Sequence, residues 1–62
     1  MRDFMFEIIG EDSENCGEQF FVEAEDLEEA WVIAYANFGD EEIGYLGEFS
    51  VDEAEDIGLD TY

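Results

Sequence analysis

The fold of this chain is decided by its central stretch, residues 20–39, which reads FFVEAEDLEEAWVIAYANFG. Phe20, Val22 and Ala24 fall on one face of an alternating pattern, which has the two-residue period of a β-strand. From Leu27 onward the apolar residues recur at spacings of three and four, which is the period of an α-helix. The stretch therefore predicts a strand that passes almost directly into an amphipathic helix.

Both ends of this predicted helix carry capping residues. Asp26 suits the N-cap position, and Glu29 stands three residues later, as a capping box requires. Gly39 follows the last apolar residue, where a left-handed C-cap belongs. We expect a helix from about Leu27 to Phe38 that packs across one face of a sheet, with Trp31 at the centre of the contact. Its apolar stripe consists of Leu27, Ala30, Trp31, Ala34 and Phe38.

Two further segments have the character of strands. Residues 4–9 alternate like residues 20–24, and a polar stretch bounded by glycines joins the two, so they are most simply antiparallel neighbours. Residues 43–49 fit a third strand. Gly44 and Gly47 interrupt this third strand, and glycines in such positions indicate a bulge or a close approach of another backbone.

The chain ends in a second, shorter helical pattern over about residues 51–57. Ser50 and Glu53 repeat the capping signal at its start, and Gly58 supplies a C-cap, with Leu59 folding back onto Ala54. The order is ββαβα. We therefore predict one α+β domain over residues 1–62, with a small single-layer antiparallel sheet of about three strands, one main helix and a short C-terminal helix.

Charge narrows the range of functions. Twenty of the 62 residues are Asp or Glu, Arg2 is the single basic residue, and the net charge is −19. Direct binding to nucleic acid or to an anionic membrane needs Lys and Arg, so neither is expected as a partner. The lone Cys16, the absence of a secretory signal and the absence of a long apolar segment predict a cytoplasmic protein.

Catalysis and metal binding are also not expected. The chain has no His to act as a general base and no Lys to form a Schiff base. Sixty-two residues can hardly enclose a substrate cleft and also build a core around it. No acidic segment matches an EF-hand loop, and weak counterion binding explains the acids better than a specific metal site. We therefore predict a protein that is not an enzyme and carries no cofactor.

Three explanations compete for the acidic surface: imitation of nucleic acid, a solvated coat suited to high salt, and an interaction module with a basic partner. The first predicts that carboxylates gather, because their average density over the surface is only about half that of DNA. The residues expected to meet a basic, nucleic-acid-binding partner are Glu11, Asp12, Glu14, Glu18, Glu23, Glu25, Asp40, Glu41 and Glu42.

Some apolar residues remain outside the predicted core. Met5, Ile9 and Phe21 fall on the strand face opposite the main helix. An apolar patch rimmed by acids is typical of a protein interface or a homodimer contact. The alternative is that the second helix, with Ile57 and Leu59, covers this face.

Three segments together resemble a known group of proteins. They are the strand-then-helix pattern of residues 20–31, YLGEF at residues 45–49 and GLDTY at residues 58–62. In these the chain is similar to small acidic uncharacterised proteins of phages and conjugative elements. Its composition is separately similar to the DNA-mimic inhibitors of restriction and CRISPR defences. Because that second likeness lies in charge alone, it implies an anti-restriction role but assigns no residue.

Overall fold

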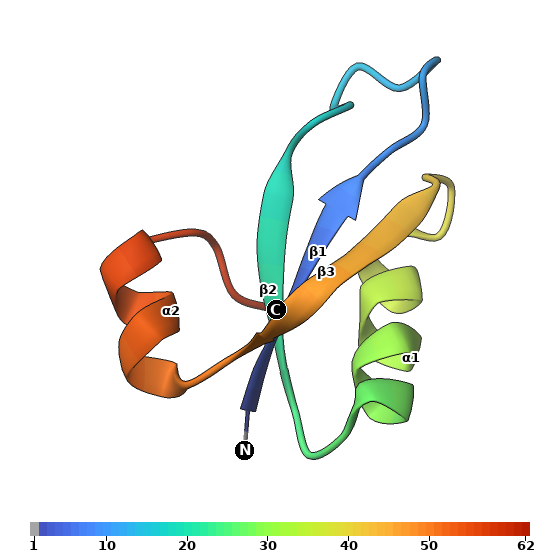
Figure 1. Ribbon diagram of the computed structural model, residues 1–62. Helices are drawn as coiled ribbons and strands as arrows, with labels where there is room; N and C mark the ends of the chain where they lie inside the picture. The colour runs from blue at the N-terminus through green and yellow to red at the C-terminus, as the bar shows by residue number, and fades with distance from the viewer. Residues whose placement is uncertain (1) are drawn as a thin grey trace.

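The structure is a computed structural model that describes residues 2–62, and its elements follow the predicted ββαβα order (Figure 1). The strands are β1 (Arg2–Ile8), β2 (Gln19–Ala24) and β3 (Ile43–Phe49), and the helices are α1 (Leu27–Phe38) and α2 (Val51–Ile57). The α+β class is confirmed. Of the five elements, α1, β3 and α2 begin and end at the predicted residues.

The sheet has the strand order β2-β1-β3, and both pairings are antiparallel. The N-terminal strand is therefore the central one, which explains why Phe4, Met5 and Phe6 are buried in succession on both of its faces. Met5 pairs with Gly47, whereas Phe6 pairs with Tyr45, so one extra residue of β3 lies between them. This register shift beside Gly47 favours the bulge among the two alternatives that the sequence left open.

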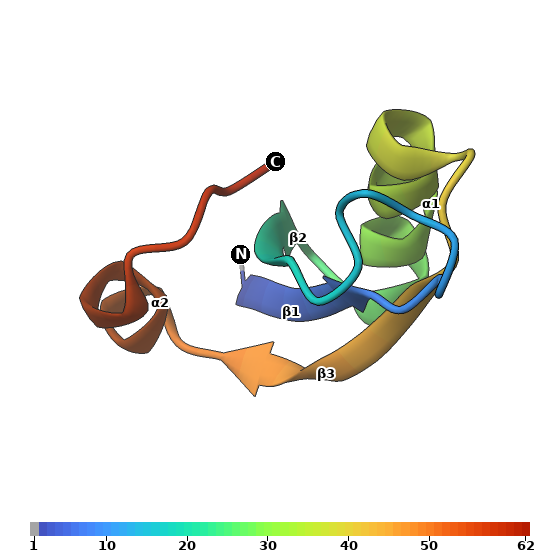
Figure 2. The ribbon, with the colours of Figure 1, turned by 90° about the horizontal axis from the view of Figure 1, so that it is seen from above.

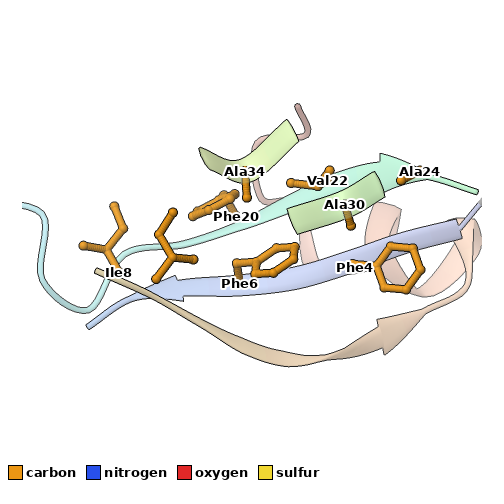
Figure 3. Packing of buried hydrophobic residues seen from close by; sticks show 9 residues of the cluster. Phe4, Phe6, Ile8, Phe20, Val22, Ala24, Ala30 and Ala34 are labelled. Atoms are coloured by element: carbon orange, nitrogen blue, oxygen red, sulfur yellow. The ribbon is translucent and has the colours of Figure 1, made fainter. Parts of the chain in front are cut away.

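One face of the sheet is covered by α1, and the main core lies between them (Figure 3). The helix residues that are fully buried are Ala30 and Ala34. Their small side chains let the helix lie close to the sheet, which leaves no room for an indole between the two layers. Trp31 is instead half-buried at the border of the core, where it meets the Phe6 ring at 4.9 Å between centroids. The prediction that Trp31 lies at the centre of the contact is wrong.

The opposite face is covered by α2 and the chain that follows it, as Figure 2 shows from above. Met5 and Phe21 are buried there against Ala54, and Leu59 packs on the same cluster. The prediction that Met5 and Phe21 form an exposed partner surface is therefore wrong, because their own chain covers them. The alternative is confirmed for Leu59, while Ile57 is 45% exposed and is not part of this cluster.

The last residues of the chain extend the sheet at its β2 edge. The N–H of Phe21 donates to the carbonyl of Asp60 at 2.9 Å, and the N–H of Tyr62 donates to the carbonyl of Phe21 at 2.8 Å. Thr61 and Phe21 form a parallel bridge. The Tyr62 ring contacts the Phe38 ring at 5.1 Å between centroids. This tail protects the outer edge of β2 and connects the two faces of the molecule.

The helix caps follow the sequence with one exception. Asp26 accepts the N–H of Glu29 at 2.8 Å, and Gly58 is a left-handed C-cap with φ 78°, as expected. Gly39, however, has a right-handed conformation with φ −60°. A Cβ at this position would lie 2.8 Å from the carbonyl oxygen of Tyr35, so close approach rather than a left-handed turn requires the glycine.

Within residues 2–62, neither helix has the length and apolarity that a membrane span requires.

The close approach of α1 to the sheet can be tested by changing the size of one alanine. We expect Ala34→Leu to destabilise the protein by about 1–3 kcal/mol, because the added side chain has no space against β1 and β2. That is a large part of the roughly 3–9 kcal/mol typical of a domain this small. The matched control, Ala36→Leu on the exposed side of the same helix, should change stability by less than about 0.5 kcal/mol. Urea unfolding followed by circular dichroism measures both, and equal effects would contradict the packing described.

Candidate functional site

Two loops distant in sequence meet at one end of the sheet. The β1–β2 loop and the α1–β3 loop lie side by side (Figure 1), and the N–H of Ile9 donates to the carbonyl of Glu42 at 2.9 Å. The Ser13 hydroxyl also donates to the Glu41 carboxylate, across 28 positions of the chain. Between the loops is an open cavity of about 560 Å³, here called the loop hollow. It is lined by Ile9, Gly10, Glu11, Asp12, Ser13, Asp40, Glu41 and Glu42.

The loop hollow concentrates negative charge. Five of the nine predicted acidic site residues line it: Glu11, Asp12, Asp40, Glu41 and Glu42. The only arginine of the chain lies elsewhere, at the start of β1, where Arg2 pairs with Glu48 on β3 at 2.7 Å. Within residues 2–62, no group of three or more possible ligands is placed to hold a metal ion. The hollow is therefore suited to attracting the cationic side chains of another molecule.

The remaining acidic site residues lie apart from the loop hollow. Glu14 and Glu18 are exposed on the same β1–β2 loop but do not line the cavity. Glu23 and Glu25 lie at the other end of β2, and a strand of six residues separates the two ends by roughly 20 Å. The fold thus brings the acids of residues 11–18 close to those of residues 40–42 and holds Glu23 and Glu25 at a distance.

Of the three predicted apolar site residues, Ile9 remains accessible. It is 47% exposed and belongs to the loop hollow, beyond the end of β1. Its side chain lies against Gly44, where a Cβ would be 3.4 Å from the Ile9 Cγ2 atom. Ile9 therefore forms an apolar part of an acidic cavity and does not join Met5 and Phe21 in one patch.

A second cavity, of about 400 Å³, lies where α2 and the C-terminal tail meet the sheet. We call it the tail hollow. Asp3 of β1 lines it together with Glu23, its direct neighbour in the β1–β2 register. Sequence reasoning missed Asp3, although strand alternation places it on the same face as Met5. The full lining is Asp3, Glu23, Val51, Ala54, Glu55, Gly58, Leu59 and Thr61.

Asp3 is the one buried charged residue among those described, with 3% of its surface exposed. Its Oδ1 atom has no hydrogen-bond partner in residues 2–62. Burial raises the pKa of the Asp3 carboxyl above its ordinary value, and the nearby charge of Glu23 raises it further. The positive charge at the amino terminus of the chain acts in the opposite direction but does not cancel the upward shift.

An uncharged aromatic strip interrupts the acidic surface. Residues 30–39 contain no charged side chain, in a chain where twenty of 62 residues are acidic. Within this run Val32 is 66% exposed, and Trp31 stacks on the exposed Tyr35 at 5.6 Å between ring centroids. Exposed Tyr45 of β3 joins the strip through the ring of Phe6, at 5.7 Å. The uncharged run was the sequence signal that could have identified the α1 residues of the strip.

Comparison with protein-family models, with curated proteins and with solved structures gave no match for this chain. The resemblance to small acidic proteins of phages and conjugative elements therefore stays a prediction.

The buried carboxyl of Asp3 leads to a pH-dependence of stability. The pKa of Asp3 in the folded protein lies above the ordinary value of 3.8. At pH values between these two pKa values, the native state holds a proton that the unfolded state has released. This contribution makes the protein less stable as the pH rises from about 3.8 through the folded pKa, and the loss is complete above it. Asn cannot ionise, so Asp3→Asn should lack this component.

We expect Asp3→Asn to be more stable than the unmodified protein at pH 7 and to lose that advantage toward pH 4. Urea unfolding of both proteins across this range measures the difference. The other carboxyls are common to both, including Glu23 and Glu55 beside Asp3, and so is the amino terminus. A difference that does not vary with pH would contradict the upward pKa shift.

Proposed function

We propose that this protein is a non-enzymatic inhibitor of the DNA-mimic type, which occupies the basic nucleic-acid-binding groove of a host or defence protein. The observation that carries this proposal is the loop hollow, where five carboxylates from two separate loops gather with no basic residue among the lining residues. The Ser13–Glu41 and Ile9–Glu42 hydrogen bonds hold the two loops together. The negative charge is thus presented on a fixed shape.

The average charge density explains why such gathering matters. A surface of 4103 Å² divided by 19 net negative charges gives about 216 Å² per charge. B-DNA carries roughly one charge per 100–120 Å² of its surface. A uniform acidic coat would therefore present about half the density of DNA, so imitation of DNA requires the carboxylates to gather locally. A groove that binds phosphates by Lys and Arg would attract such a group over a long range and bind it.

The scarcity of ion pairs among the carboxylates of residues 2–62 also favours this function. In residues 2–62 one acidic side chain, Glu48, is engaged in an ion pair. The others form no ion pair with another of residues 2–62. A net charge of −19 opposes the compact state through self-repulsion. A basic partner would relieve that repulsion on binding, which adds a favourable term to the association.

A second candidate is a protein-interaction domain that uses the aromatic strip, either with another protein or in a homodimer. The exposed Val32, Tyr35 and Tyr45 favour it, since Tyr and Trp are enriched in interfaces and few acids interrupt this region. The strip takes the place of the Met5, Ile9 and Phe21 face, two residues of which are buried. The two candidates predict different responses to salt, because apolar contacts are not screened.

The first test is a pull-down from bacterial lysate on the immobilised protein, eluted with duplex DNA and then with salt. We expect DNA to release a protein with a nucleic-acid-binding groove, identified by mass spectrometry, because DNA competes for the same groove. If DNA releases nothing and salt releases only proteins without such a groove, the DNA-mimic function is wrong.

The purified partner then allows the site to be tested with two variants of equal charge. The loop-hollow variant carries Glu11→Gln, Asp12→Asn, Asp40→Asn and Glu42→Gln. The control variant carries Glu28→Gln, Asp52→Asn, Asp56→Asn and Asp60→Asn, all on exposed positions outside both hollows. We expect the first to weaken binding about tenfold or more, and the second to have a clearly smaller effect. Calorimetry at two salt concentrations measures both, and equal losses would show that total charge rather than the hollow decides binding.

The second candidate is tested by the double variant Val32→Ser and Tyr35→Ser, which leaves the net charge unchanged. If the aromatic strip is the interface, this variant should lose partner or self-association at all salt concentrations, as measured by analytical ultracentrifugation. If the loop hollow is the interface, the variant should bind as the unmodified protein does and the loop-hollow variant should fail.

A further inference from the structure

The tail hollow differs from the rest of the acidic surface because one of its carboxylates is buried. Asp3 is 3% exposed, whereas Glu23 and Glu55 on the same cavity are exposed. The Oδ1 atom of Asp3 has neither water contact nor a hydrogen-bond partner in residues 2–62. A buried carboxylate oxygen without a donor is unfavourable, since desolvation is not compensated. Because Asp3 also lines an open cavity, its uncompensated carboxyl group points to a ligand that supplies a donor there.

The charges around the cavity determine the charge of that ligand. Glu23 lies directly opposite Asp3 on the neighbouring strand, and Glu55 faces the same space from α2. The only arginine of the chain is engaged with Glu48. Burial and the charge of Glu23 together outweigh the charge of the amino terminus, so the pKa of Asp3 stays raised. A neutral donor would not reduce the negative charge of the three carboxylates, whereas a cation neutralises part of that charge.

The remaining walls determine the shape of the ligand. Val51, Ala54 and Leu59 give the cavity an apolar side, and about 400 Å³ is enough for a small organic group. A bare metal ion would gain nothing from apolar walls, and residues 2–62 contain no set of ligands arranged for one. An aliphatic chain that ends in a positive charge fits both the apolar side and the buried carboxylate.

We propose that the tail hollow binds an alkylammonium group, whose N–H donates to the carboxylate of Asp3 while its aliphatic chain packs against Val51 and Leu59. Two sources carry this group: a lysine side chain of a basic partner protein, or a free polyamine. The lysine source rests on the proposed function, whereas the polyamine source does not. In either case the bound ammonium supplies a hydrogen-bond donor and a positive charge to the Asp3 carboxylate.

The test uses the isolated full chain and n-butylammonium as the probe, at pH 7 and about 0.15 M salt to screen non-specific attraction. We expect saturable changes of the amide signals of Asp3, Glu23 and Leu59 in NMR spectra. Tetramethylammonium has the same charge but no N–H, and it should not produce them. Asp3→Asn should bind butylammonium at least about tenfold more weakly. The matched control Asp12→Asn, in the loop hollow, should bind it unchanged.

A second measurement does not depend on a substitution. Bound ammonium favours the ionised carboxylate, so butylammonium should lower the pKa of Asp3, followed through its carboxyl carbon signal. The proposal is overturned if the two ammonium ions produce the same changes, if Asp3→Asn binds as well as the unmodified chain, or if the Asp3 titration does not respond.

The source of the group is decided by comparing Nα-acetyl-lysine N-methylamide with spermidine. Binding of the lysine derivative at least as tightly as spermidine supports a side chain of a partner protein. Tighter binding of spermidine, lost in Asp3→Asn, supports a free polyamine. Because no partner is present, failure of this titration overturns the tail hollow alone. Failure of the pull-down with duplex DNA overturns the proposed function and leaves the amine site standing.

Discussion

The burial of β1 on both of its faces is the constraint on which the rest of the structure depends. Phe4, Met5 and Phe6 follow one another in the central strand, so neither face of the sheet can remain open to water. Covering one face requires α1, and covering the other requires α2 and the tail. In a chain this short, every helix and strand is thereby used for the core. The functional surface is left to the loops and to the outer sides of the helices.

The same constraint decides where the charge lies. Acidic side chains occupy loops, helix starts and solvent-exposed positions, where they remain hydrated. The packed layers between the sheet and its two helices exclude charge. Asp3 is the exception among the described residues, because its position in β1 places it on the face that α2 covers. A carboxylate held in that place weakens the folded state at neutral pH. Such a local disadvantage in a marginally stable domain is typical of a group with a binding role.

The surface that results has two acidic cavities and an uncharged strip between acidic regions. The loop hollow gathers carboxylates from two loops, the tail hollow holds a buried one, and the strip on α1 and β3 carries exposed aromatic rings. Protein interfaces commonly combine an apolar centre with a polar or charged rim. A basic partner that contacts more than one of these regions would gain affinity from charge and from apolar burial together.

The sequence by itself determined the elements and their order. The limits of α1, β3 and α2 were predictable because caps and apolar periodicity act within a few residues, as the Asp26–Glu29 hydrogen bond illustrates. It also identified the acids that line the loop hollow, although not that Glu11 and Glu41 would line one cavity while Glu23 would lie at the far end. Only the tertiary structure decided which of these acids lie together. It also decided that Trp31 lies at the border of the core and that Met5, Phe21 and Asp3 are buried. These outcomes depend on the distance between α1 and the sheet and on the return of the C-terminal tail. Both arise from contacts between residues far apart in the chain, which no local pattern records.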